Sequence, residues 1–343
     1  MLDCSANSLT TLDVSKNTEL LYFSCSDCQL TVLDLSHNTQ LGTLWCNSNL
    51  LKTLDLSKNT SLRFLSCVSN ELTTLDVSYN PELSILQCSS NQITELDISQ
   101  LTELTSLVCP DNRLTALDLS QNTELTDVTC GGNQLTKLDV SKNTKLEQLS
   151  CNNNQLTELS LKQNPALTWL GCSSNKLTEL DLSQIYELQS LECNDNQLTE
   201  LDLSHNAKLG TLYCNGNLLT SLNGNSNPEM YWIECNNNQL TTLDVSAQAE
   251  LMRLECSGNK LMTLDVSKNT ELATLFCAYN ELTTLDISRN TALRNLNCSY
   301  NPGDGVSVFP VTAWFDNASI PNNISLYEHE CCLLYTSPSP RDA

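Results

Sequence analysis

Apolar and polar residues follow one pattern that returns every 21 residues, from the start of the chain to about residue 301. Fifteen cysteines, from Cys4 to Cys298, stand at this interval without insertion. In each unit a Leu-x-Cys stretch alternates apolar and variable positions, as in a strand with one buried face. Self-similarity at such a period indicates stacked repeats that bury their apolar faces on one another. The pattern therefore predicts one elongated repeat domain in which Leu275 and Cys277 point inward and Phe276 points outward.

The positions that recur in every unit give the outline LxxLxCxxNxLTxLDVSxNTx. Asn follows the cysteine by three residues in 14 of the 15 units, and Cys28 takes its place in the exception. An amide both donates and accepts hydrogen bonds, so this Asn is expected to satisfy backbone groups where the chain leaves the strand. Leu follows the cysteine by eight residues and is predicted to line the other side of the coil.

This outline resembles the leucine-rich repeat, LxxLxLxxNxL, with Cys in the third leucine position. Its 21-residue length and nested LxxLxC and LxxLD motifs are similar to the bacterial class called IRREKO, and to surface proteins of the Bacteroidales type. The resemblance implies a mainly β, right-handed solenoid of about 15 rungs. Its parallel sheet would form the concave face, and extended, turn or short 3₁₀ segments the convex side. It also implies part of a larger bacterial protein at the cell surface or secreted.

Three segments are expected along the chain. Residues 1–301 form the solenoid, which begins in the middle of a unit and is therefore interpreted as N-terminally truncated. Residues 302–330 depart from the repeat and are predicted to cover the last rung. Residues 331–343, which include Ser-Pro-Ser-Pro, resemble a translated sequencing adapter and are expected to be disordered.

The net charge of −23 argues against a nucleic-acid partner, whose backbone attracts Lys and Arg. Asp follows the cysteine by nine residues in twelve units, with Ser160 and Asn223 as exceptions. We interpret these aspartates as acceptors of turn hydrogen bonds. The sequence D-x-S-x-N, as in Asp265 to Asn269, also resembles the start of a calcium loop. However, it lacks the glycine and the final acid of such a loop, so no metal site is predicted.

The cysteines are predicted to be free, buried thiols. Side chains stacked at the strand spacing point the same way, with Cβ atoms about 4.8 Å apart, which is longer than a disulfide prefers. Cys25 and Cys28 form a CxxC, but Cys28 occupies the Asn position and no second CxxC matches it. A small core residue with a raised pKa and little reactivity is therefore favoured over a redox or zinc site.

The variable strand positions are the places where a binding site is free to evolve. They lie three and one before each cysteine, and one and two after it. The chain has four Trp, nine Tyr and five Phe, and nine of these aromatics fall on this face, including Tyr279 and Tyr300. Exposed Trp and Tyr are common interface anchors, although aromatics also suit strands in general. The binding residues predicted on the concave face are Tyr22, Trp45, Phe64, Trp169, Tyr213, Trp232, Phe276, Glu192, Glu234 and Glu255.

These residues form an early zone, Tyr22 to Ile85, and a late zone, Trp169 to Phe276, with polar rungs between them. The late zone carries the three glutamates and suits a partner with basic and apolar groups. We expect a non-enzymatic scaffold for a protein ligand, such as a host or bacterial surface protein. A carbohydrate-binding surface and a stalk without a ligand stay open as alternatives. His37 and His205 lie in turns, no catalytic motif or cofactor site is present, and no apolar run has the length of a membrane span.

Overall fold

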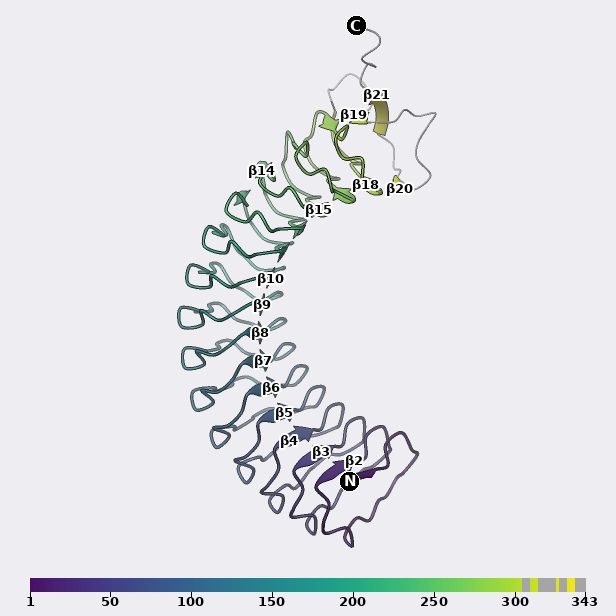
Figure 1. Cartoon of the computed structure of the whole chain (residues 1–343), viewed down its shortest axis with the longest axis vertical. Helices are drawn as coiled ribbons and strands as arrows, with labels where there is room; N and C mark the ends of the chain where they lie inside the picture. The colour runs from purple at the N-terminus through teal and green to yellow at the C-terminus, as the bar shows by residue number, and fades with distance from the viewer. Residues whose placement is uncertain (304–308, 314–324, 327–331, 337–343) are drawn as a thin grey trace. The chain divides into compact units, whose positions relative to one another are not determined.

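The chain folds into a parallel β-solenoid of about 14 turns in a computed structural model. The structure describes residues 1–303, 309–313, 325–326 and 332–336, and no helix occurs in these ranges. Two compact units are distinguished. Unit 1 comprises Met1–Leu167 with Ser174–Lys176, and unit 2 comprises Thr168–Ser173 with Leu177–Ala343. Within each unit the strands follow one another along one side of the coil and turns lie along the other (Figure 1). The predicted fold class is thereby confirmed.

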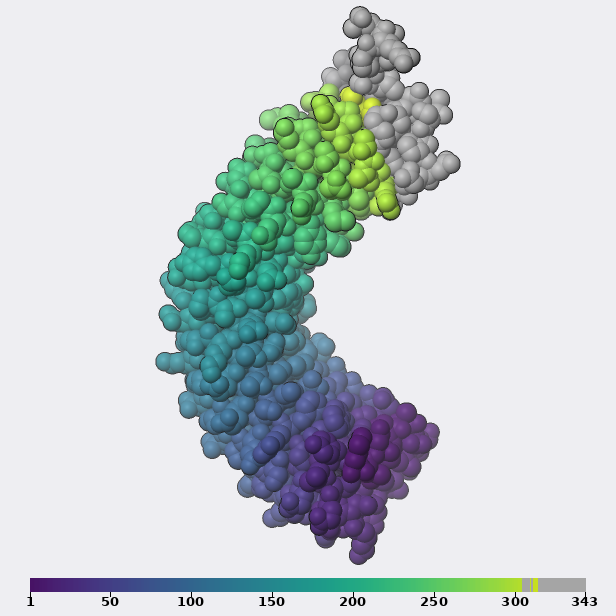
Figure 2. All heavy atoms as spheres, in the orientation of Figure 1, coloured from purple at the N-terminus to yellow at the C-terminus, as the bar shows by residue number. Residues whose placement is uncertain are grey.

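Unit 1 contains eight short strands that pair in parallel with a register of 21 residues. Tyr22 lies opposite Thr43, and Thr43 lies opposite Phe64. The space-filling view shows the rungs following one another in chain order (Figure 2). The strands are β1 (Leu2–Asp3), β2 (Tyr22–Ser24), β3 (Thr43–Trp45), β4 (Phe64–Ser66), β5 (Ile85–Gln87), β6 (Ser106–Val108), β7 (Asp127–Thr129) and β8 (Gln148–Ser150).

Unit 2 has the same 21-residue register within it, so that Trp169 lies opposite Ser190 and Thr211 opposite Trp232. Its strands on this face are β9 (Trp169–Gly171), β10 (Ser190–Glu192), β11 (Thr211–Tyr213), β13 (Trp232–Glu234), β15 (Arg253–Glu255), β16 (Thr274–Phe276), β18 (Asn295–Asn297) and β20 (Ser325–Leu326). The opposite side carries two smaller parallel sheets, which pair β12 (Ser221–Asn223) with β14 (Thr242–Asp244), and β17 (Leu285–Asp286) with β19 (Phe309–Ala313) and β21 (Cys332–Thr336).

The core is built from the inward residues of each rung. The middle strand residue and the cysteine two positions later are fully buried in unit after unit, as Leu44 and Cys46 are. The cysteines from Cys4 to Cys298 form no disulfide, and burial raises the pKa of Cys46 and Cys88 to about 12. Cys28 lies in the Asn position, with its Sγ 3.5 Å from the Cys4 carbonyl oxygen. The interpretation of these cysteines as small core residues is confirmed.

Two columns of buried amides tie successive rungs together. Asn133, three after its cysteine, accepts a hydrogen bond from the Leu114 N–H of the previous rung at 2.9 Å. Its Nδ2 donates to the carbonyls of Cys109, Cys130 and Gly131. The second column lies 13 after the cysteine, where Asn122 Nδ2 donates to Ile98 and Leu101 at 2.9 and 2.8 Å. The first column confirms the prediction that the Asn three after the cysteine satisfies backbone groups.

The aspartates nine after the cysteines accept hydrogen bonds in turns. Asp265 Oδ1 accepts from the Ser267 N–H at 2.9 Å, and Asn223 Oδ1 accepts from Asn225 in the same way. All twelve repeat aspartates make this bond to the residue two positions later. It lowers the pKa of Asp265, chiefly through the Ser267 backbone. The structural interpretation of the Asp stripe is confirmed.

The segment after the repeats contributes three paired strands, of which β20 pairs with β18. Val311 in β19 lies opposite Leu285 of the last complete unit, and the same strand pairs with β21. Where the sequence predicts disorder for residues 331–343, the structure places Cys332–Thr336 in β21. Residues 304–308, 314–324, 327–331 and 337–343 lie outside the described ranges, so the proposed segment boundaries and the adapter origin stay predictions.

Candidate functional site

The outward side chains of the strands form what we call the sheet face. In each strand the middle residue is buried, while the residues on either side of it are mostly part-exposed, as in Trp232-Ile233-Glu234. All ten predicted binding residues lie on this face, at the ends of strands β2 to β4, β9 to β11, β13, β15 and β16. The structure places the early zone in unit 1 and the late zone in unit 2.

The early zone contains one aromatic pair. The Trp45 and Phe64 ring centroids lie 5.1 Å apart, with the ring planes tilted by 44°. Tyr22 stands opposite Thr43, which in turn lies opposite Phe64, and the Tyr22 side chain is 50% exposed. The structure thus brings Trp45 and Phe64 into contact, and Tyr22 adds exposed ring surface two strands away.

The late zone contains a larger cluster centred on Trp232. Its ring centroid lies 5.8 Å from that of Tyr213, and the guanidinium carbon of Arg253 lies 4.6 Å from the Trp232 ring centroid. A cation at this distance over an indole is attracted by the electrons of the ring. Trp232 is therefore held between an aromatic ring and a cation from the two neighbouring rungs.

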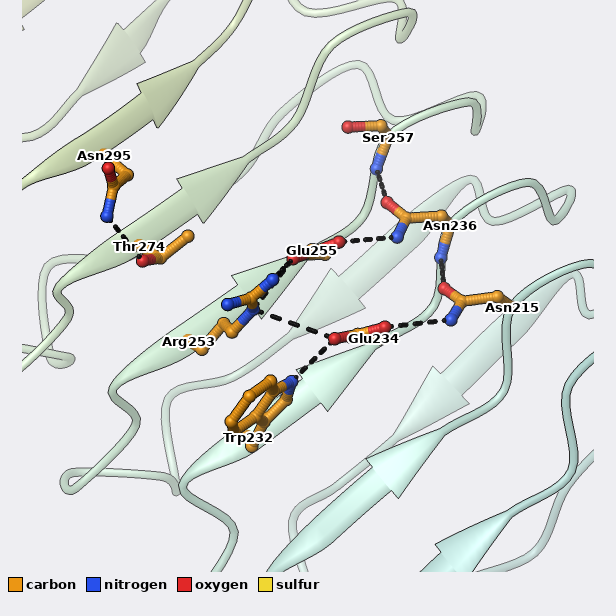
Figure 3. A network of polar contacts seen from close by, with 9 residues as sticks. All are labelled: Asn215, Trp232, Glu234, Asn236, Arg253, Glu255, Ser257, Thr274 and Asn295. Atoms are coloured by element: carbon orange, nitrogen blue, oxygen red, sulfur yellow. Dashed lines mark hydrogen bonds and ion pairs between the residues drawn. The ribbon is translucent and has the colours of Figure 1, made fainter. Parts of the chain in front are cut away.

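Two of the predicted glutamates hold this cluster in place. Glu234 Oε1 accepts a hydrogen bond from Trp232 Nε1 at 2.8 Å and lies 3.7 Å from Arg253 Nε. Glu255 Oε1 accepts from Arg253 Nε at 2.8 Å and is also bonded by its Nη2. Arg253 thus bridges both carboxylates (Figure 3). Glu234 and Glu255 therefore share one cationic partner within the chain.

A column of asparagines braces the same carboxylates from the other side. Asn215 Nδ2 donates to Glu234 at 3.1 Å, and Asn236 Nδ2 donates to Glu255 at 3.0 Å. The Oδ1 atoms of these two asparagines accept backbone N–H groups of the next rungs, Asn236 and Ser257, at 2.7 and 2.8 Å. The glutamates are therefore fixed to the backbone through the asparagines (Figure 3).

Glu192 differs from the other two glutamates. Its side chain is half-buried, and it has no hydrogen-bond or ion-pair partner among the residues that the structure describes. Desolvation raises the pKa of its carboxyl group. Burial also raises the pKa of Tyr213, and the charges of Glu234 and Glu192 add to that shift. Tyr213 therefore lies in the field of both carboxylates.

Apolar side chains extend the late zone beside the strands. Tyr231 and Met252, each four before its cysteine, are exposed on neighbouring rungs. Gly210 makes room for Tyr231, since a Cβ on Gly210 would lie 2.9 Å from its ring. Phe276 lies opposite Glu255 in β16 and ends the zone.

A separate aromatic pair lies in the turns after β16 and β18. The Tyr279 and Tyr300 rings stack with centroids 4.2 Å apart and planes within 9°, and both side chains are more than half exposed. Both residues have positive φ, at 53° and 56°, where the corresponding places of the other units hold Ala, Ser, Asp, Asn or Gly. A bulky residue there is strained by about 1–2 kcal/mol. Their positions two after the cysteine thus lie in a turn at the margin of the sheet face.

Position within the repeat identified the aromatic residues and the glutamates but missed their partners. Arg253 stands three before its cysteine, the place that Trp232 occupies in the previous unit, and Asn215 and Asn236 stand one after theirs. Reading charged residues at these same places, and not only aromatics, would have found Arg253. The late zone is consequently less acidic than the three glutamates alone predict.

No group of three or more potential metal ligands of the His, Cys, Asp or Glu type occurs in the described part of the chain. His37 and His205 lie in turns beside Ser36 and Ser204, at 3.1 Å. No helix within the described ranges is long and apolar enough to cross a membrane.

Comparison with solved structures gives 39% sequence identity and a TM-score of 0.88 to the functional domain of InlJ from Listeria monocytogenes, which includes a cysteine ladder. The match covers 95% of this chain and 72% of that one. The leucine-rich-repeat protein LIC12759 of Leptospira interrogans is 25% identical, with a TM-score of 0.75 over 80% of this chain and 76% of its own. An internalin, InlF, of Listeria monocytogenes shares the fold at 23% identity and a TM-score of 0.76, over 83% and 88%. No protein-family model and no curated protein sequence matches the chain.

Proposed function

Because the chain belongs to the family of bacterial cysteine-ladder leucine-rich-repeat proteins that includes the functional domain of InlJ, we propose that it is a scaffold that binds a protein partner. The partner docks on the sheet face of unit 2, with Tyr213, Trp232 and Arg253 as anchors. The observation that carries this proposal is the cluster of these three residue types, part-exposed and fixed on three successive strands of this face.

The physical argument is preorganisation. Tyr, Trp and Arg dominate the binding energy of protein interfaces, in part because they present large contact areas. Fixing a free side chain on binding costs about 0.5–1.5 kcal/mol. The bonds from Glu234 to the indole N–H and from Glu255 to the guanidinium have already fixed Trp232 and Arg253. A partner therefore loses little side-chain entropy here.

The finer parts of the proposal rest on the family likeness and the repeat pattern. They are a localisation at the cell surface or outside the cell, an origin in bacteria of the Bacteroidales type, membership of the nested IRREKO-type repeat class, and a role without enzymatic activity. The early zone around Trp45 and Phe64 would serve as a second contact surface for the same kind of partner. Binding of a glycan stays the alternative, since aromatic rings also stack on sugars.

A paired array experiment tests the class of ligand. The labelled chain is applied to an array of protein ectodomains and to an array of glycans, each probed in parallel with Trp232→Ala. We expect protein spots that the wild type binds and Trp232→Ala does not. Binding confined to glycans would replace the proposal with its alternative. No signal on either array would favour the stalk and contradict the proposal.

A further inference from the structure

The repeat allows two rungs of unit 2 to be compared position by position. Trp232 in β13 lies opposite Arg253 in β15, and Glu255 follows Arg253 by two residues on the same face. Trp169 in β9 lies opposite Ser190 in β10, and Glu192 follows Ser190 by two residues. The Trp, the residue opposite it and the Glu therefore occupy the same repeat positions in both sets. The residue opposite the Trp is the cation Arg253 in the first set and Ser190 in the second.

In the first set the cation is bound from three directions. Arg253 lies over the Trp232 ring, is bonded to Glu255 and lies 3.7 Å from Glu234. In the second set the Ser190 hydroxyl accepts a hydrogen bond from Thr211 Oγ1 at 2.7 Å, and Glu192 has no partner among the described residues. The second set thus has the carboxylate and the Trp but lacks a cation in the position of Arg253.

The neighbours of Glu192 leave it accessible on the face. Along its row it lies between Gly171, which has no side chain, and Tyr213. Ser190 and Thr211 beside it are short. From the strand spacing, the Cα atoms of Trp169 and Glu192 lie about 8 Å apart, which is a distance that a long side chain bridges. Aromatic residues on the strands to either side of Glu192, Trp169 in β9 and Tyr213 in β11, make a site for an elongated cation.

The chemistry of this place selects its occupant. When a neutral or acidic group of a partner covers a carboxylate, the carboxylate loses its water and gains no opposite charge, which costs free energy. A cation that covers it supplies the opposite charge. Trp and Tyr faces add cation–π attraction of about 0.5–2 kcal/mol. We propose that Glu192, with Trp169 and Tyr213, receives a Lys or Arg side chain of the protein partner, in the arrangement that Arg253 makes within the chain. This inference rests on the proposed function and names the chemistry of its partner.

The test uses a random 12-residue peptide library displayed on phage and selected on the full chain. Selections run in parallel on the wild type, Glu192→Gln, Ser190→Arg and the control Ser190→Ala. Ser190→Arg supplies the missing cation from within, so it should occupy the site as Arg253 does. Glu192→Lys serves as a charge reversal. Affinities of individual peptides are then measured on each variant, with Trp232→Ala as a separate control.

We expect wild-type peptides to be enriched in Lys or Arg at one position. Their affinity should fall about fivefold to tenfold on Glu192→Gln and on Ser190→Arg, and be unchanged on Ser190→Ala. Selection on Glu192→Lys should instead favour Asp or Glu at that position. Peptides that bind Glu192→Gln as tightly as the wild type, or that show no basic preference, overturn the inference.

The two proposals fail in different ways. If peptides bind Trp232→Ala weakly but bind Glu192→Gln as tightly as the wild type, the sheet face stays the binding surface. Only the proposal that Glu192 receives a basic side chain is then contradicted. Peptides that bind all variants equally contradict the proposed function, and the inference falls with it.

Discussion

At the scale of single residues, the place of a residue in the 21-residue unit decides its environment. Cys46 and Cys88 are fully buried for the same reason, because both follow a strand leucine by two residues. This phase could be read from the sequence, and so could the exposure of Trp232 and Glu234. The hydrogen bond between those two side chains could not be, since it depends on rotamers that a pattern does not specify. The repeat pattern predicts a strand position for Tyr279, whereas its backbone is left-handed, with a φ of 53°.

The turn aspartates give a prediction about pH. The bond from the Ser267 N–H lowers the pKa of folded Asp265, so its stabilisation is present above the ordinary Asp pKa and is lost as pH falls through the lowered value. Asp265→Ala should melt below the wild type at pH 7, and this difference should shrink as the pH falls below the ordinary Asp pKa. Thermal melts over a series of pH values from neutral to strongly acidic measure it. Asp265→Asn is the control, because an amide keeps the acceptor, as Asn223 does, without titrating.

A difference between wild type and Asp265→Ala that stays constant from neutral to strongly acidic pH would contradict the role of the charged carboxylate. The position is exposed, so the effect at one rung is small. Replacing several of the twelve aspartates together should enlarge it.

At the scale of the rung, the buried Asn three after most cysteines links neighbouring rungs. Sequence predicted that this Asn satisfies backbone groups, and the structure shows that Asn133 serves both its own rung and the previous one. The additional strands β12, β14 and β17 on the opposite side of unit 2 were not predicted. β14 and β17 match the same outline as rungs without such strands, so the outline holds no signal for them, whereas β12 contains Asn223, one of the two exceptions at the Asp position.

Removing this amide should be costly. Asn133→Ala leaves the Leu114 N–H and the Cys109 carbonyl without the bonds that the side chain makes, in a buried place. We expect a loss of about 2–4 kcal/mol in the free energy of unfolding by urea, together with faster amide exchange at Leu114. Asn7→Ala is the matched control, because Asn7 has the same place but is exposed and bonds only to Cys4 and Ser5. Equal losses in both variants would contradict the account.

At the scale of the molecule, the fixed period predicted the solenoid, its parallel register and its inward residues. The reason is that a repeat without insertion forces each strand opposite the equivalent residues of the next. The ligand was beyond this reasoning, because the residues that specify it are the ones that vary. The structure sharpens that part by separating Glu234 and Glu255, which have partners, from Glu192, which has none among the described residues.

The most direct test of the central claim measures the affinity of two variants, Trp232→Ala and Tyr186→Ala, for a protein ligand found on the array. Trp232→Ala should weaken binding by about 30-fold or more, the effect of losing a hot-spot residue worth about 2 kcal/mol. Tyr186→Ala removes a ring that is 49% exposed in a turn outside the sheet face, and should bind like the wild type. Both variants should melt within a few degrees of the wild type. Wild-type affinity in Trp232→Ala, or an equal loss in Tyr186→Ala, would contradict binding through this face.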